Sequence, residues 1–143
     1  MAVVSNARTE WAGDLFSGSG TTTLASGVGS FAVNWNARSE GEDAITTPEE
    51  LLAGAHASCF SMALALGLSI NGTPATSITT DARVTFVAGE GITGIELAVV
   101  ANVPTLDQDG FAAIAADAKD NCPVSKALSA VPITLVEAAL VQS

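Results

Sequence analysis

The stretch HASCFSMALALGLSI, residues 56–70, decides how this sequence folds, because it is an almost unbroken apolar run of helical length. The residues before it carry the signals of a helix start. Thr47 is a suitable N-cap, Pro48 suits the first helical position, and Glu50 follows three residues after Thr47, as in a capping box. The sequence therefore predicts one helix from residue 48 to about residue 69.

This predicted helix is apolar nearly all the way round. One face carries, at helical spacing, Leu52, Ala55 or His56, Cys59, Met62 or Ala63, and Leu66. The opposite side carries Phe60, Leu64 and Leu68. A helix without a polar face has to lie at the centre of a fold. Because glycine, serine and histidine interrupt the run, we expect a core helix and not a lipid-spanning one.

The rest of the chain predicts short strands and two further helices. We expect strands at 7–13, 20–26, 30–37, 77–87, 92–103 and 132–140, the first two of which form a hairpin. We expect helices at about 107–120, capped by Asp107 or Asp109, and from Pro123 onward, and a charged surface loop at 38–47. No linker divides the sequence, so residues 1–143 are expected to form a single α+β domain.

Composition narrows the classes of partner. The net charge of −10 argues against nucleic acid and anionic membranes, both of which need a basic face. The start of the chain is polar by residue 5 and does not read as a signal peptide. Two cysteines in such a chain predict a cytoplasmic protein with a redox or catalytic pair in preference to a structural disulfide.

Cys59 permits two interpretations that the residues alone leave open. Free cysteine is often a small buried hydrophobic residue, whereas a reactive thiol needs its pKa lowered by a helix N-terminus or a nearby cation. Cys59 lies about three turns into its helix, so the helix dipole cannot lower its pKa. Among five cations, Arg38 stands out because it lies in the charged loop before this helix, although a solvated loop charge is the alternative.

Cys122 and His56 have alternatives of their own. Cys122 precedes Pro123 near the start of the last short helix, where backbone N–H groups would stabilise a thiolate, but it also fits a buried structural position. His56 lies one turn before Cys59 on the same face. A cysteine hydrolase would need a further residue to orient it, and a metal site would need further ligands, so we expect His56 to be active-site wall or hydrogen-bonded core.

Two motifs carry a resemblance to a known family. The segments TPEELLAGAHASCFSMAL (47–64) and NCPVSKAL (121–128), together with the opening TEWAGDLFSGSGT (9–21), resemble the OsmC/Ohr family of thiol peroxidases, and specifically its OsmC branch. The resemblance implies an OsmC-like α+β fold in which central apolar helices are wrapped by antiparallel sheets in an intertwined homodimer. It covers nearly the whole chain.

The resemblance also implies a role for four residues. Cys59 corresponds to the peroxidatic nucleophile, Cys122 to the resolving thiol, Arg38 to the activating arginine, and Glu49 to its carboxylate partner. The implied activity is reduction of an organic hydroperoxide through a Cys59 sulfenic acid and a Cys59–Cys122 disulfide, with a dithiol reductant such as a lipoylated protein and with no cofactor or metal. The alternatives are a cysteine hydrolase using Cys59 and His56, and a non-catalytic binding module.

Helix geometry adds a condition on this site. Glu49 and Cys59 are ten residues apart, which is about 15 Å along one straight helix. Either the helix breaks, for example at Gly54, or Arg38 and Glu49 of one subunit serve Cys59 of the other. The continuous apolar spacing favours an intact helix, and therefore a shared site.

Overall fold

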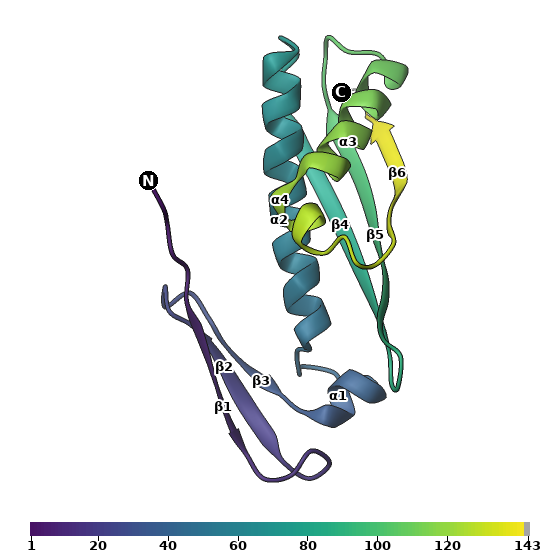
Figure 1. The fold of residues 1–143 in the computed structure, drawn as a ribbon. Coiled ribbons are helices and arrows are strands. Elements are labelled where there is room, and N and C mark those ends of the chain that lie inside the picture. Colours follow the sequence, from purple (N-terminus) through teal and green to yellow (C-terminus); the bar gives the residue numbers. More distant parts are fainter. Residues whose placement is uncertain (142–143) are drawn as a thin grey trace. The chain divides into compact units, whose positions relative to one another are not determined.

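The structure, a computed structural model, describes residues 1–141. Within them the chain forms two compact units that divide inside the long helix, the first being Met1–Leu51 and the second beginning at Leu52 (Figure 1). Each unit combines a three-stranded sheet with helical segments, so the predicted α+β class is confirmed. The prediction of a single domain over residues 1–143 stays a prediction.

The first unit is built on an antiparallel sheet of order β1-β2-β3. Its strands are β1 (Ala7–Ala12), β2 (Ser19–Leu24) and β3 (Ser30–Val33), and the predicted hairpin of the first two is confirmed. The expected strand at 30–37 is wrong in its second half, because the Asn34 side chain accepts a 2.7 Å hydrogen bond from the Ala37 N–H. That bond caps a short helix, α1 (Trp35–Ser39).

The second unit is built on a sheet of order β4-β5-β6. The hairpin of β4 (Ser77–Val87) and β5 (Gly91–Asn102) is antiparallel and follows the prediction closely. The last strand, β6 (Ile133–Leu140), pairs with β5 in parallel, so the expectation of antiparallel sheets is wrong here. Two helices connect β5 to β6, and a connection of that length lets the chain return in the same direction.

Local capping signals place the helices. The long helix α2 spans Pro48–Ile70, and the Thr47 hydroxyl accepts a 3.0 Å hydrogen bond from the Glu50 N–H, as predicted. The Glu50 carboxylate does not close the capping box: it accepts a 2.6 Å bond from the Thr46 hydroxyl. The helix α3 (Gln108–Asn121) is capped by Asp107, and α4 (Pro123–Ala127) begins at its proline.

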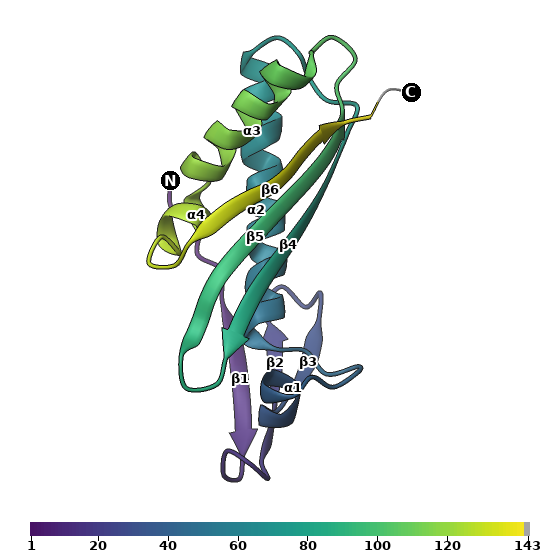
Figure 2. The same ribbon diagram turned by 90° about the vertical axis from the view of Figure 1, so that its right-hand side faces the viewer.

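The core of the second unit lies between its helices and one face of its sheet (Figure 2). Every fourth residue of α2 faces this core, and alternate residues of β5 meet the apolar stripe of α3. The fully buried members are Phe60, Leu64 and Leu68 from α2, Leu97, Val99 and Ala101 from β5, Phe111 and Ala115 from α3, and Cys122 between α3 and α4.

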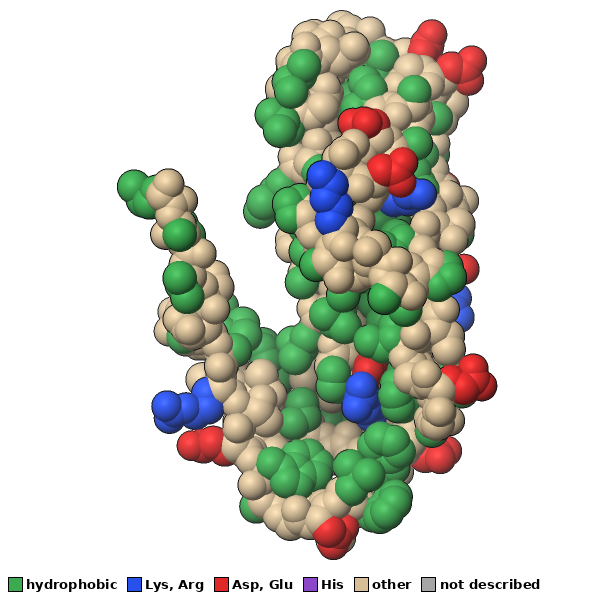
Figure 3. All heavy atoms as spheres, in the orientation of Figure 1, with side chains coloured by type: hydrophobic (Ala, Val, Ile, Leu, Met, Phe, Trp, Pro, Cys, Tyr) green, Lys and Arg blue, Asp and Glu red, His purple; other side chains and the backbone are tan. Residues whose placement is uncertain are grey.

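The other face of α2 is open in this chain. Met62, Leu66 and Ile70 are 73%, 62% and 78% exposed, and Figure 3 shows hydrophobic side chains at the surface over this helix. The prediction that this helix is central, with sheets of two chains around it, stays a prediction. By length and mean hydropathy α2 also passes as a helix that could cross a membrane. A core helix meets the same criterion.

Candidate functional site

Two free thiols meet in the second unit. Cys59 projects from α2 and is half-buried, while Cys122 lies at the junction of α3 and α4 and is fully buried. Cys122 is a member of the hydrophobic core, and Cys59 packs against it. The proximity of each thiol also shifts the pKa of the other. The fold thus brings together two cysteines that are far apart in the sequence.

The backbone around Cys122 is fixed by the proline that follows. Its φ of −54° and ψ of 128° are not helical, as expected for a residue before Pro123. The Cys122 N–H donates to the Ala118 carbonyl at 2.9 Å, and the Cys122 carbonyl accepts from the Lys126 N–H at 3.1 Å. Cys122 therefore ends α3 and begins α4, and both helices hold its backbone in place.

The two thiols have opposite pKa shifts. Burial raises the pKa of Cys59, and the nearby Cys122 thiol raises it further. Burial alone would also raise the pKa of Cys122, but the nearby Cys59 thiol, the N–H and hydroxyl of Ser125 and the Val124 N–H together lower it. Within one chain, Cys122 is therefore the more acidic thiol, and Cys59 needs a further charge to become a reactive thiolate.

A buried polar pair lies beside the thiols. His56 Nε2 and Ser125 Oγ are 2.7 Å apart, with His56 fully buried and Ser125 5% exposed. The expectation that His56 is hydrogen-bonded core is confirmed. Ser125 was not singled out from the sequence, although its place three residues after Cys122, in the same turn, was a signal that could have found it.

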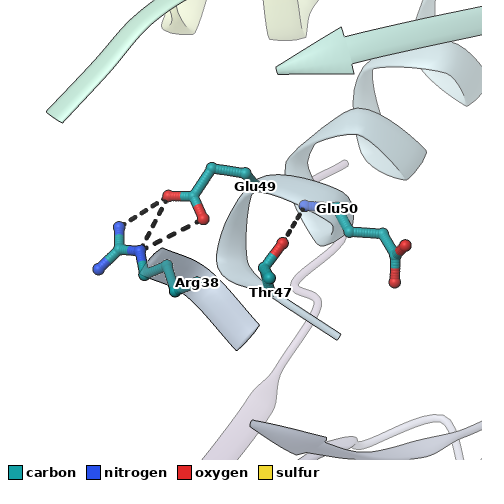
Figure 4. A network of polar contacts seen from close by, with 4 residues as sticks. All are labelled: Arg38, Thr47, Glu49 and Glu50. Atoms are coloured by element: carbon teal, nitrogen blue, oxygen red, sulfur yellow. Dashed lines mark hydrogen bonds and ion pairs between the residues drawn. The ribbon is translucent and has the colours of Figure 1, made fainter. Parts of the chain in front are cut away.

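Arg38 and Glu49 form an ion pair in the first unit (Figure 4). Arg38 Nη2 lies 2.7 Å from Glu49 Oε1, and Arg38 Nε donates to both carboxylate oxygens, at 3.1 Å and 3.3 Å. Glu49 is 5% exposed, so the guanidinium compensates a carboxylate that is almost removed from water. Arg38 was predicted to lie in a surface loop but lies in the last turn of α1, because the Asn34 cap starts a short helix that includes it.

An apolar pocket of about 310 Å³ borders this arginine. Its walls come from the first sheet, from α1 and from the start of α2. They include Trp11, Leu15, Val33, Trp35 and Leu51, and Arg38 also lines the pocket. The first unit thus combines a fixed cation with an aromatic, largely apolar cavity.

The four predicted site residues fall into two pairs, with Arg38 and Glu49 in the first unit and Cys59 and Cys122 in the second. Glu49 and Cys59 share α2, which is unbroken between Pro48 and Ile70. The alternative of a break at Gly54 is therefore excluded, and ten residues along an intact helix correspond to about 15 Å. Among residues 1–141, no group of three or more His, Cys, Asp or Glu side chains could hold a metal ion.

Comparison with known sequences points to one family. A family model described as OsmC-like protein matches residues 41–136. Peroxiredoxin OsmC of Escherichia coli (strain K12) is 42% identical over 134 residues, which cover 91% of this chain and 93% of that protein.

Comparison with solved structures gives the same fold. An organic hydroperoxide resistance protein OsmC from Legionella pneumophila superposes with a TM-score of 0.70 and 20% identity, over 98% of this chain and 100% of that one. An OsmC-like protein from Mycoplasma pneumoniae superposes with a TM-score of 0.72 and 14% identity, over 99% and 100%. At such identities these structures establish the architecture alone.

Proposed function

The chain belongs to the OsmC family, and from this premise we propose that it is a thiol-dependent peroxidase that reduces organic hydroperoxides to alcohols. The observation that carries the proposal is the pair of free thiols: Cys122 belongs to the core of the second unit, and Cys59 packs against that core. The relative from Escherichia coli is named a peroxiredoxin, a class whose chemistry needs a reactive thiolate.

The reaction follows from thiol chemistry. The Cys59 thiolate attacks the terminal oxygen of the hydroperoxide, the O–O bond breaks, and the alkoxide takes a proton to leave as an alcohol. Cys59 is then a sulfenic acid. Cys122 attacks the sulfenic sulfur, water leaves, and a Cys59–Cys122 disulfide remains for an external dithiol to reduce. The half-buried position of Cys59 suits the attacking thiol, because a substrate has to reach it.

Arg38 supplies the charge that Cys59 lacks in its own unit. A guanidinium at the thiol would offset the effect of burial on the pKa of Cys59 and would stabilise the charge that develops on the leaving oxygen. Glu49 would hold the guanidinium in one orientation through the bonds described above. Its near-complete burial supports this positioning role.

The active site is then shared between two subunits of a homodimer. The unbroken helix separates Glu49 from Cys59 by about 15 Å, which is too far for the Arg38–Glu49 pair to serve Cys59 of the same α2 without strain. A second copy would also cover the exposed face of α2, where Met62, Leu66 and Ile70 leave apolar surface open to water. We therefore assign Arg38 and Glu49 of one subunit to Cys59 of the other.

The substrate is an organic hydroperoxide because the cavity beside Arg38 is apolar. Two tryptophans and three aliphatic side chains line a volume of about 310 Å³, which would favour a hydrocarbon group over water or hydrogen peroxide. The reductant is an external dithiol, such as a lipoylated protein, and the compartment is the cytoplasm, where thiols are kept reduced. No membrane or nucleic-acid partner is part of the proposal.

Mass spectrometry tests the proposal directly. After one equivalent of cumene hydroperoxide, the chain should lose two hydrogens, and digestion should give a joined pair of peptides containing Cys59 and Cys122. Cys59→Ser should stop hydroperoxide consumption with the fold intact, since a hydroxyl is a far weaker nucleophile. Substantial dithiol-dependent turnover by a folded Cys59→Ser protein would contradict the assignment.

The contacts of His56 do not favour the hydrolase alternative. A hydrolase would require His56 to act as base toward Cys59, whereas its Nε2 bonds to Ser125. The binding-module alternative predicts that neither thiol reacts, and the same mass measurement would detect that outcome.

A further inference from the structure

The buried pair of His56 and Ser125 lies beside the resolving thiol and has no role in the reaction described above. Its two partners come from α2 and α4, and their 2.7 Å hydrogen bond is removed from solvent. Ser125 lies three residues after Cys122, so the two side chains share one face of the turn. The hydroxyl is bonded to the imidazole and lies near enough to the Cys122 sulfur to affect the pKa of that thiol.

The tautomer of His56 decides what the hydroxyl can do. Burial lowers the pKa of His56, so the ring is neutral and carries one proton. Its Nδ1 is buried with no hydrogen-bond partner among residues 1–141. A proton on Nδ1 would be an orphaned buried donor, which proteins rarely tolerate. With the proton on Nε2, the ring donates to Ser125 Oγ, and the hydroxyl hydrogen is left for another acceptor.

We propose that His56 and Ser125 are positioning residues for Cys122: His56 Nε2–H holds the Ser125 oxygen, and the Ser125 hydroxyl donates to the Cys122 sulfur and stabilises its thiolate. This inference rests on the proposed role of Cys122 as the resolving thiol. The lowered pKa of Cys122, to which the Ser125 hydroxyl contributes, agrees with it. His56, which is unsuited to act as a base on Cys59, thereby has a role in the second half of the cycle.

The step that it serves balances without another reagent. The Cys122 thiolate attacks the sulfur of the Cys59 sulfenic acid, the S–S bond forms and the S–O bond breaks. Hydroxide leaves and takes up the proton that Cys122 had released, so the product is water. When an external dithiol later attacks Cys59, Cys122 leaves as the same stabilised thiolate, and a thiol of lower pKa leaves faster.

Other charged groups could also stabilise Cys122. The titratable group of α2 that affects the pKa of Cys122 is the Cys59 thiol. The cations closest to it along the chain are Lys119, which pairs with Asp120 at 3.2 Å, and Lys126, which is exposed. Lys119→Gln and Lys126→Gln are therefore included as controls, and neither should reproduce the effect of Ser125→Ala.

The first experiment needs no substitution. The chain contains one histidine, so a long-range 1H–15N correlation spectrum gives a single set of imidazole signals. We expect the Nε2–H tautomer at neutral pH, and we expect these signals to shift when the disulfide forms and removes the thiolate acceptor. An Nδ1–H tautomer would overturn the proposal, because Ser125 would then donate to His56 and not to Cys122.

The second experiment measures the titration of the Cys122 thiol and the rate of disulfide formation in matched variants. Ultraviolet thiolate absorbance in a Cys59→Ser background reports the titration of Cys122 alone. Ser125→Ala should move that titration to higher pH and, with Cys59 intact, should slow disulfide closure about tenfold while sulfenic acid forms at the original rate. Ser125→Thr keeps the hydroxyl and should retain both the original titration and the original rate of disulfide closure. Ser129→Ala, at an exposed serine, should change neither the titration nor the rate.

Two substitutions of His56 distinguish a positioning role of its N–H group from a role in packing alone. His56→Gln keeps an N–H donor near the Nε2 position, whereas His56→Leu removes it. We expect the leucine variant to shift the Cys122 titration and the glutamine variant to shift it less. Equal titrations in the two variants, or no shift in either, would overturn the inference whatever their thermal stability. The titration needs no peroxide, so it stands apart from Cys122→Ser turnover, which tests the resolving role itself.

Discussion

Subunit exchange between two inactive variants tests the shared site. Cys59→Ser leaves Arg38 intact, and Arg38→Ala leaves Cys59 intact. The two variants are mixed under conditions that let two-fold dimers exchange their subunits. The geometry behind it is the unbroken α2 helix, along which Glu49 and Cys59 are separated by about 15 Å.

The expected recovery follows from symmetry. In a mixed dimer, Arg38 of the first variant faces Cys59 of the second, so one of the two sites is complete. Random exchange of equal amounts makes about half of the dimers mixed, so the total activity should rise to about one quarter of the wild-type value. If the site lay within one chain, every site in a mixed dimer would lack one residue and no activity would return.

The assay is dithiol-dependent consumption of cumene hydroperoxide before and after exchange. Native mass spectrometry counts the mixed dimers, and each parent variant incubated alone is the control. Mixed dimers at the expected abundance without recovered activity would refute the shared site. A chain that remains monomeric while fully active would refute both the shared site and the dimer.

Four further changes have outcomes set by single residues. Cys122→Ser should react once with hydroperoxide and then accumulate sulfenic acid, detected by dimedone, and unaffected turnover would remove its resolving role. Arg38→Ala should slow the peroxide step on the order of a hundredfold and shift the pH profile of iodoacetamide alkylation upward, while the exposed Arg83→Ala should do neither. Leu64→Ala removes a fully buried side chain from the core and should cost about 2–5 kcal/mol in urea unfolding, and a loss under about 1 kcal/mol would contradict the described packing. Burial lowers the pKa of His56 below 6.5, so the unfolded chain binds a proton first as the pH falls. Stability should therefore decline below about pH 6.5, and His56→Gln should flatten that decline when unfolding is measured across pH.

Local signals in the sequence were enough to place most of the helices and strands. Thr47, Pro48 and Asp107 act within a few residues of themselves, so the starts of α2 and α3 were predictable. Alternation of apolar residues located the β4–β5 hairpin for the same reason. The Asn34 cap was missed because the alternating pattern of 30–37 also fits a strand, and only the bond to Ala37 distinguishes the two.

Tertiary packing decided what an all-apolar helix could not specify. The sequence of α2 offers two apolar faces, and contact with the second sheet selected the face of Phe60, Leu64 and Leu68. The parallel pairing of β6 likewise depends on the path of the α3–α4 connection across the sheet, which no local pattern encodes.

The residues of the candidate site were likewise predictable from the sequence only in part. Both cysteines, and the family to which their motifs belong, were visible in the sequence because motif residues keep their spacing. The resemblance also implied that Cys59 meets Cys122 and that Glu49 pairs with Arg38. The pairing of Ser125 with His56 and the near-complete burial of Glu49 were not visible. Each depends on side chains from different elements meeting where water is excluded. There, a hydrogen bond or a charge acts through a low local dielectric, and only the folded chain creates that environment.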